Sequence, residues 1–186
     1  LIKSGEKSLR RYAVEESHQY FREAYQLLTQ KGISTDRDKE LLIDLLVKWG
    51  FVYYYNGEYR KLQDLLEAHR GIAETLTDKN RLGMYYAWLS CPLWHREKPK
   101  EAYAILSLAR SLGEETGNPA VMGYAYTWLT WTCMEMGRLS EAADFAEKAQ
   151  ILCRSGDFDP YIYFNSLGGL AYVHFYRGER RKTYEA

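Results

Sequence analysis

Apolar and small residues recur along this chain at a constant interval of 40 positions. The block EAYAILSLA at 101–109 aligns with EAADFAEKA at 141–149, and the same step backwards reaches EYRKLQDLLEAH at 58–69. A less regular copy, ESHQYFREA, lies at 16–24. The matching positions in a block are three to four residues apart, which is the spacing of one helical face. The sequence therefore predicts several copies of one helix in a repeat array.

Glycines mark the ends of a second set of helices. Gly57 and Gly137 lie 80 residues apart, and Gly178 follows Gly137 after 41 residues, each behind an aromatic-rich stretch. Glycine just past a helix end supplies the left-handed backbone that closes the helix. Glu97 stands in place of this glycine in the third copy.

Polar residues mark the helix starts. Asn118 and Asp159 each precede a proline, which combines a capping side chain with the residue favoured at the first helical position, and Asp36 and Asp78 can cap two earlier helices. Pro92 should kink one helix or end it early near Cys91. We predict no β-sheet, and helices near residues 14–30, 38–55, 59–76, 79–95, 99–116, 119–136, 139–154 and 160–177.

This unit of helix, glycine turn, helix and polar cap resembles the tetratricopeptide repeat (TPR), with its W-x2-L-G-x2-Y and A-x3-F pattern. The fourth copy fits best, with Tyr126, Leu129 and Cys133 in its first helix and Ala142, Ala146 and Ala149 in its second. The resemblance implies one all-α domain over 1–186, a right-handed superhelix of antiparallel helix pairs. Its approximate repeats would be 1–33, 36–76, 78–116, 118–156 and 158–186.

The first and last of these repeats are expected to be incomplete. The chain starts at Leu1 rather than Met and stops where a helix should begin, so we expect a fragment of a longer protein. The first copy would supply only a second helix, and the last pair would be cut short. An uncovered apolar face at the C-terminal end would then favour self-association.

A closer resemblance rests on the opening GEKSLRRYAVEESHQYFREAYQLL and on the segment LLIDLLVKWGFVYYYNGEYRKLQDLLEAHRGIAETLTDKNRLGMYYAWLS. Both look like the repeat array of bacterial multidomain ATPase/nucleotide cyclase signalling proteins, and they are also similar to the arms of ATP-dependent transcription activators. This resemblance implies a regulatory array within a signalling protein. The catalytic ATPase and cyclase modules of those families are not present in this sequence.

The charge balance bears on the class of partner, and the cysteine content bears on the cellular compartment. Lys+Arg and Asp+Glu number 25 each, so the chain lacks the basic excess expected for phosphate binding. No apolar stretch is long enough to span a bilayer. Three cysteines are an odd number in a chain too large to need disulfide stapling, which favours a reducing compartment. We expect a cytoplasmic protein without a nucleic-acid or membrane partner and without a disulfide.

The sequence offers no convincing catalytic constellation. It contains neither a G-x-x-x-x-G-K-[ST] loop nor a G-x-G-x-x-G loop. Cys91 and His95 have the four-residue spacing of two metal ligands on one helical face, but Pro92 lies between them and no further pair completes the shell. We therefore expect no enzyme, no cofactor and no metal.

Aromatic residues make up 15% of the chain, with 17 Tyr and 5 Trp, and most fall on the first helices of the repeats. One stripe of each first helix must face the core, and a different stripe lines the concave groove. In the repeat register the groove stripe contains Phe51, Tyr54, Tyr55, Trp94, His95, Tyr124, Trp131, Met134, Tyr172, Phe175 and Tyr176. It lacks the Lys, Arg and Asn of a clamp for peptide carboxylates.

Two interpretations of this stripe remain open. It can bind a peptide, a helix or a neighbouring domain, or the longer helices of this repeat can bury it as structure. Our functional prediction is a non-catalytic interaction scaffold. The alternative is a domain in which the aromatic groove encloses and senses a small molecule.

Overall fold

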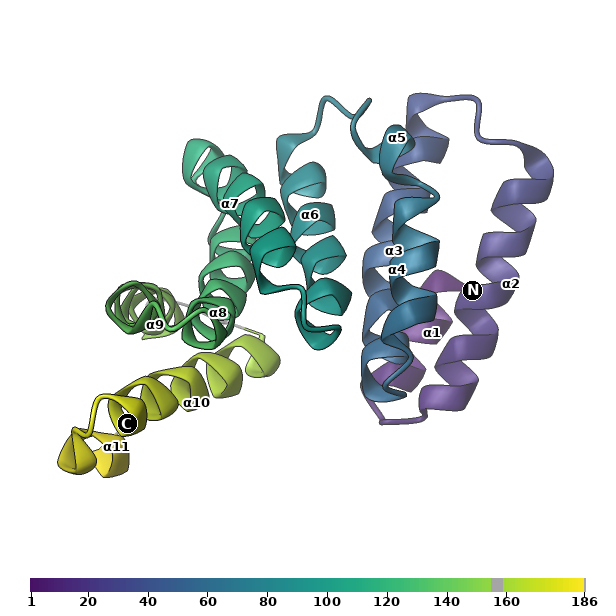
Figure 1. Ribbon diagram of the computed structural model, residues 1–186. Helices are drawn as coiled ribbons and strands as arrows, with labels where there is room; N and C mark the ends of the chain where they lie inside the picture. The colour runs from purple at the N-terminus through teal and green to yellow at the C-terminus, as the bar shows by residue number, and fades with distance from the viewer. Residues whose placement is uncertain (155–158, 186) are drawn as a thin grey trace.

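The computed structural model describes residues 1–154 and 159–185, which form helices joined by turns, with no strand among them. The array of antiparallel helix pairs curves from α1 to α11 (Figure 1). The helices are α1 (Ile2–Leu9), α2 (Val14–Lys31), α3 (Asp36–Tyr55), α4 (Tyr59–Glu67), α5 (Arg70–Ala73), α6 (Lys79–His95), α7 (Pro99–Thr116), α8 (Pro119–Glu135), α9 (Leu139–Arg154), α10 (Pro160–Tyr176) and α11 (Arg180–Glu185).

The helix starts follow from local capping chemistry. Asn118 accepts hydrogen bonds from the backbone N–H groups of Ala120 and Val121, and Asp78 caps α6 in the same way. The cap of α3 is Thr35 rather than the predicted Asp36. Thr35 and Asp38 form a reciprocal capping box, so Asp36 becomes the first helical residue.

The turns between paired helices have one shared backbone conformation. Gly57, Gly137 and Gly178 have φ angles of +67°, +71° and +74°. Glu97 takes the same place in the third copy with φ of +59°. A side chain at such a φ is strained, so the turn geometry is imposed by the helix pairing and not by glycine alone.

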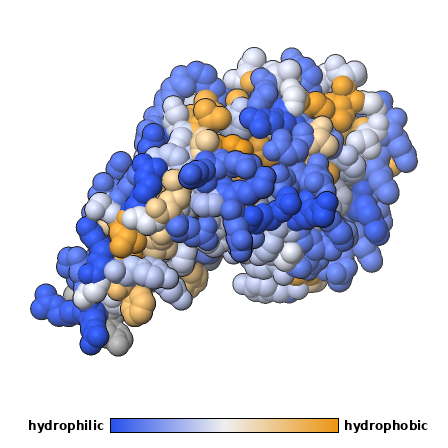
Figure 2. Space-filling model, viewed as in Figure 1, coloured by the Kyte–Doolittle hydropathy of each residue, from blue (hydrophilic) through white to orange (hydrophobic). Residues whose placement is uncertain are grey.

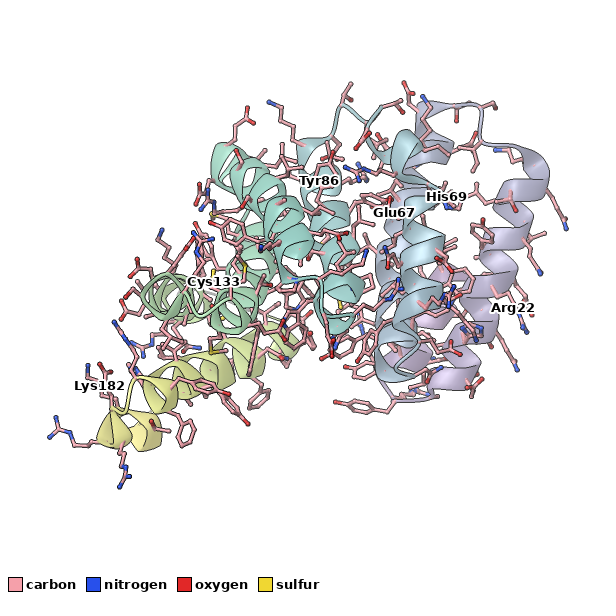
Figure 3. All side chains as sticks on the ribbon, in the orientation of Figure 1. Arg22, Glu67, His69, Tyr86, Cys133 and Lys182 are labelled. Carbon is pink, nitrogen blue, oxygen red and sulfur yellow. The ribbon has the colours of Figure 1, made fainter. Side chains whose placement is uncertain are left out.

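Two features of the first and second copies differ from the sequence-based expectations. The first copy has both helices, because α1 packs against α2 and the Ser17 hydroxyl donates to the Gly5 carbonyl at 2.9 Å. The predicted helix 59–76 breaks at His69, whose ring contacts the Leu65 carbonyl at 2.9 Å and the Tyr25 hydroxyl of α2 at 3.2 Å (Figure 3). The other copies carry a small residue here, and the larger ring interrupts the helix to reach α2.

The sequence suggested that Pro92 kinks its helix or ends it early near Cys91. In the structure the helix does not end there. Helix α6 runs through this residue to His95. Proline removes one helical hydrogen bond, but Cys91, Pro92 and Leu93 are all buried. Tertiary packing on both sides of the proline therefore holds the helix together.

The first helices α3, α6, α8 and α10 form a contiguous inner row, and α4, α7 and α9 cover it from outside. Small residues determine how closely neighbouring helices of the row approach one another. A Cβ built on Gly50 of α3 would lie 2.7 Å from the Trp88 ring of α6, and one on Gly169 of α10 would lie 2.9 Å from Thr130 of α8. Arg81 adds an ion pair across the row, with Asp44 at 3.0 Å.

Adding a methyl group at the first of these contacts should be destabilising. Trp88 is fully buried, so a shift of its ring away from the added methyl group must also displace the side chains around it. We expect Gly50→Ala to lower the free energy of unfolding by about 1–2 kcal/mol despite the better helix propensity of alanine. Gly71→Ala is the matched control, because nothing lies within 4 Å of its built Cβ and its φ is not positive. It should raise stability by up to about 1 kcal/mol in urea denaturation. Equal effects of the two substitutions would contradict the close-approach argument.

Candidate functional site

A continuous row of aromatic rings follows the C-terminal halves of the first helices. Tyr54 lies 5.6 Å from His95, Trp94 lies 6.1 Å from Trp131, and Trp131 lies 5.4 Å from Tyr172, measured between ring centroids. His95 and Trp94 are themselves in contact at 4.4 Å. We call these five residues the aromatic stripe. Four are partly buried and Tyr172 is 52% exposed, so the stripe presents ring surface to solvent.

The other residues that the repeat register assigned to the groove have different surroundings. Tyr124 is only 5% exposed, and its hydroxyl donates to Asp159 at 2.8 Å. Met134 is half-buried on α8. Phe175 and Tyr176, at the end of α10, are each 62% exposed and contact one another. Tyr124 thus belongs to the interior wall, whereas the last two residues form a separate exposed patch.

Two further groove residues, Phe51 and Tyr55, lie on the last turns of α3. Phe51 packs edge-on against the buried Trp88 ring at 4.5 Å and is partly exposed. Tyr55 is exposed and lies 6.4 Å from Phe51. These two rings face a cleft that is described below.

Tyr161, in the first turn of α10, was not among the predicted groove residues and lies among aromatic rings of α3 and α8. Its ring is 5.7 Å from Phe51, 5.5 Å from Tyr54 and stacked on Tyr124 at 6.1 Å. Its hydroxyl accepts a hydrogen bond from the indole N–H of Trp128 at 3.1 Å. Burial raises the pKa of Tyr161 above its usual value. The curvature of the array therefore brings the first turn of α10 into side-chain contact with α3.

A cleft of about 740 Å³ opens beside Tyr161, between α1 and α3 on one side and α10 on the other. Leu9, Phe51 and Tyr55 form one wall, and Phe164 is part of the other. The rim carries Lys48, which pairs with Glu6 at 2.7 Å, and the exposed Arg10. No signal in the repeat pattern marks this cleft, because no helix was predicted over residues 2–9, although they fall within the predicted first repeat, 1–33.

His95 is the most perturbed titratable group of the aromatic stripe. Its ring stacks on Tyr59 at 3.8 Å with an interplanar angle of 8°. The Nε2 atom is buried and has no hydrogen-bond partner among the described residues. Burial lowers the pKa of His95 from 6.5 to about 4. The neutral ring is therefore the form that fits this site at physiological pH.

The described residues include no group of three or more His, Cys, Asp or Glu side chains that could hold a metal. Cys91, Cys133 (Figure 3) and Cys153 are free and buried. Burial raises the pKa of the Cys91 thiol, which disfavours the thiolate form needed for metal ligation beside His95. Within the described part of the chain, no helix is both long and apolar enough to span a bilayer.

Comparison with solved structures finds TPR-like repeat proteins. The TPR-like repeats of a putative kinesin light chain from Podospora anserina are 15% identical, with a TM-score of 0.70 over 97% of this chain and 86% of that one. A Rap protein complexed with competence and sporulation factor is 14% identical, with a TM-score of 0.81 over 97% of this chain and 49% of that one.

A third structure is a signal-transduction ATPase with numerous domains and a TPR sensor, from Pyrococcus horikoshii. It is 15% identical, with a TM-score of 0.73 over 99% of this chain and 27% of that one. The chain thus spans about half of the Rap protein and about a quarter of the ATPase. No protein-family model and no curated protein sequence matches it. The predicted all-α, TPR-like superhelix of antiparallel pairs is confirmed, as is the similarity to ATPase-associated arrays.

The environment of His95 predicts acid sensitivity. The folded-state pKa of about 4 lies below the unfolded value of 6.5, so the unfolded chain takes up the proton first as the pH falls. The free energy of unfolding should therefore decrease between pH 6.5 and about 4, by up to about 3 kcal/mol from this residue. We expect His95→Phe, which keeps the ring stacked on Tyr59, to reduce this slope in urea titrations. A residual slope from His18 is expected, since burial also lowers its pKa. An unchanged pH dependence of the unfolding free energy in His95→Phe would contradict the low folded-state pKa of His95.

Proposed function

We propose that this chain is a non-catalytic interaction scaffold that binds a peptide, a helix or a neighbouring domain of a larger signalling protein. The observation that supports it most directly is the aromatic stripe, in which contacting rings from α3, α6, α8 and α10 remain partly exposed. Large rigid aromatic rings are the side chains that most often dominate the binding energy at protein interfaces.

The chemistry of the stripe favours an apolar ligand segment over a charged terminus. The places where a carboxylate clamp needs cations or amides are Val47, Phe51, Ala87, Cys91, Thr127, Trp131, Gly168 and Tyr172. Ala87, Cys91 and Thr127 are buried and so are not available to a ligand. Binding along the stripe should therefore depend only weakly on salt.

The similar structures support a scaffold role, since one is a Rap protein bound to competence and sporulation factor and another contains a TPR sensor. They have the same fold at low identity, so the partner of this chain remains a proposal. We propose a cytoplasmic location, because three unpaired thiols suit a reducing compartment. The balanced charge of the chain favours neither nucleic acid nor a membrane as its partner.

A small-molecule sensor is the second candidate, and one observation favours it. The cleft beside Tyr161 has a volume of about 740 Å³, within the usual range for small-molecule sites. Thermal-shift titration with metabolite pools separates the two candidates. A ligand that binds the folded state alone must raise the melting temperature.

Trp131 provides the test of the stripe. If Trp131 is a binding anchor, Trp131→Ala should cost less stability than the roughly 3–5 kcal/mol typical of a core aromatic, yet weaken binding by about 2 kcal/mol or more. The probe is a 12-residue peptide selected by phage display against the wild-type chain. Trp88→Ala is the matched core control, because Trp88 is fully buried in the same row. Equal destabilisation by the two substitutions, or unchanged peptide affinity, would return the stripe to a purely structural role.

The exposed end of α10 is the basis of a further proposal, that the chain self-associates. Figure 2 shows apolar patches on the arm formed by α9, α10 and α11, and further apolar patches on the upper part of the array, with hydrophilic surface between them. We expect concentration-dependent association in sedimentation velocity, weakened about tenfold by Phe175→Ser with Tyr176→Ser. Leu108→Ser, at an exposed apolar residue of α7, is the control. A monomeric wild-type chain, or equal effects of the two variants, would refute self-association through this end.

A further inference from the structure

The cleft between α1, α3 and α10 has chemistry that the aromatic stripe lacks. Its walls come from opposite ends of the array, and they meet where Tyr161 of α10 contacts Phe51 and Tyr54 of α3. Tyr161 lines the cleft and lies 5.5 Å from Tyr54 of the stripe, so the two surfaces adjoin at these rings. A ligand in the cleft would touch the first and the fifth repeats at once.

The cleft is lined by exposed apolar rings. Phe164 is 67% exposed and Tyr12 is 79% exposed, and Tyr55 lies on the wall formed by α3. Tyr12 is held with φ of +57° in the turn after α1, a conformation that a tyrosine adopts only when its surroundings impose it. Exposed aromatic surface of this extent, gathered on both sides of a concavity, marks an interaction site.

The charges on the rim are not equivalent. Glu6 is paired with Lys48, and both carboxylate oxygens of Asp159 accept hydrogen bonds, one from the Tyr124 hydroxyl and one from the Tyr161 N–H. Arg10 makes no ion pair within the described part of the chain and is exposed. The neutral hydroxyl and N–H donors leave the Asp159 charge without a cationic partner among the described residues, so the positive and negative charges of the lining balance. Arg10 is the lining cation that is free to form a new ion pair, and its guanidinium is suited to a carboxylate.

We propose that this cleft binds a peptide segment that carries an aromatic or proline side chain next to a carboxylate. The apolar side chain lies among Phe51, Tyr55 and Phe164, and the carboxylate pairs with Arg10. This inference rests on the proposed scaffold function and names the chemistry of its ligand. It also assigns ligand contacts to α1 and to the first turns of α10, outside the aromatic stripe.

The test uses three acetylated and amidated tetrapeptides: Glu-Phe-Pro-Glu, Lys-Phe-Pro-Lys and Glu-Ser-Gly-Glu. Amide chemical shifts of the isotope-labelled chain report both affinity and location. We expect Glu-Phe-Pro-Glu to bind about tenfold more tightly than either other peptide and to shift the amides of Phe51, Tyr55 and Phe164. The preference over the lysine peptide should weaken at high salt, since the rim is exposed.

Arg10→Glu should reverse the preference between the glutamate and lysine peptides, and Phe164→Ser should weaken both. Arg11→Glu is the matched control, since Arg11 is also exposed but does not line the cleft. Equal binding of the acidic and basic peptides, or equal effects of the two arginine variants, would overturn the inference.

The location of the shifts separates this inference from the proposed function. Shifts confined to Trp94, Trp131 and Tyr172 would refute the cleft as the site while supporting the stripe. If none of the three peptides shifts either surface, the cleft inference fails, and the phage-selected peptide then tests the stripe independently. Shifts at Phe51, Tyr55 and Phe164 that disappear in Arg10→Glu support the cleft as assigned.

Discussion

The packing of each first helix between two other first helices is the constraint on which the rest of this structure depends. Helices α6 and α8 each contact the helix before and the helix after them in the inner row, together with their own outer partners. Their buried residues consequently run almost without interruption, from Tyr85 to Leu93 in α6 and from Gly123 to Thr130 in α8. A helix pair of this kind cannot bury its apolar face alone, so each repeat needs its neighbours.

This constraint also explains where the aromatic rings lie. Glycines such as Gly50 bring the helices close enough for a ring to fill the space opposite, as Trp88 does. Rings placed toward the C-terminal ends of the same helices extend beyond the packed layer and form the aromatic stripe. The same first helices therefore supply the aromatic rings of both the core and the groove. A ring belongs to the core when it is buried and to the groove when part of it stays exposed.

The curvature of the array creates contacts between helices that are not neighbours in the inner row. It brings Tyr161 of α10 against Phe51 and Tyr54 of α3, which divides the concave side into the stripe and the cleft beside α1. The stripe is almost uncharged, whereas the cleft combines exposed rings with an unpaired guanidinium at its rim. Proteins that share this fold at about 15% identity need not share this division, because it depends on particular side chains.

The sequence by itself determined the features that arise from contacts within a few residues. Caps at Asp78 and Asn118 and turn glycines such as Gly137 gave the helix boundaries, and the 40-residue step gave the order of the pairs. It did not reveal the break at His69, the continuation of α6 through Pro92, or the position of Tyr161 among the rings of α3 and α8. The outcomes at His69 and Tyr161 depend on contacts between residues 33 to 110 positions apart along the chain, such as Tyr161 with Phe51. Only the summed packing of several repeats fixes the curvature that brings such residues together, and so only the tertiary structure decided which aromatic rings are core and which remain to bind.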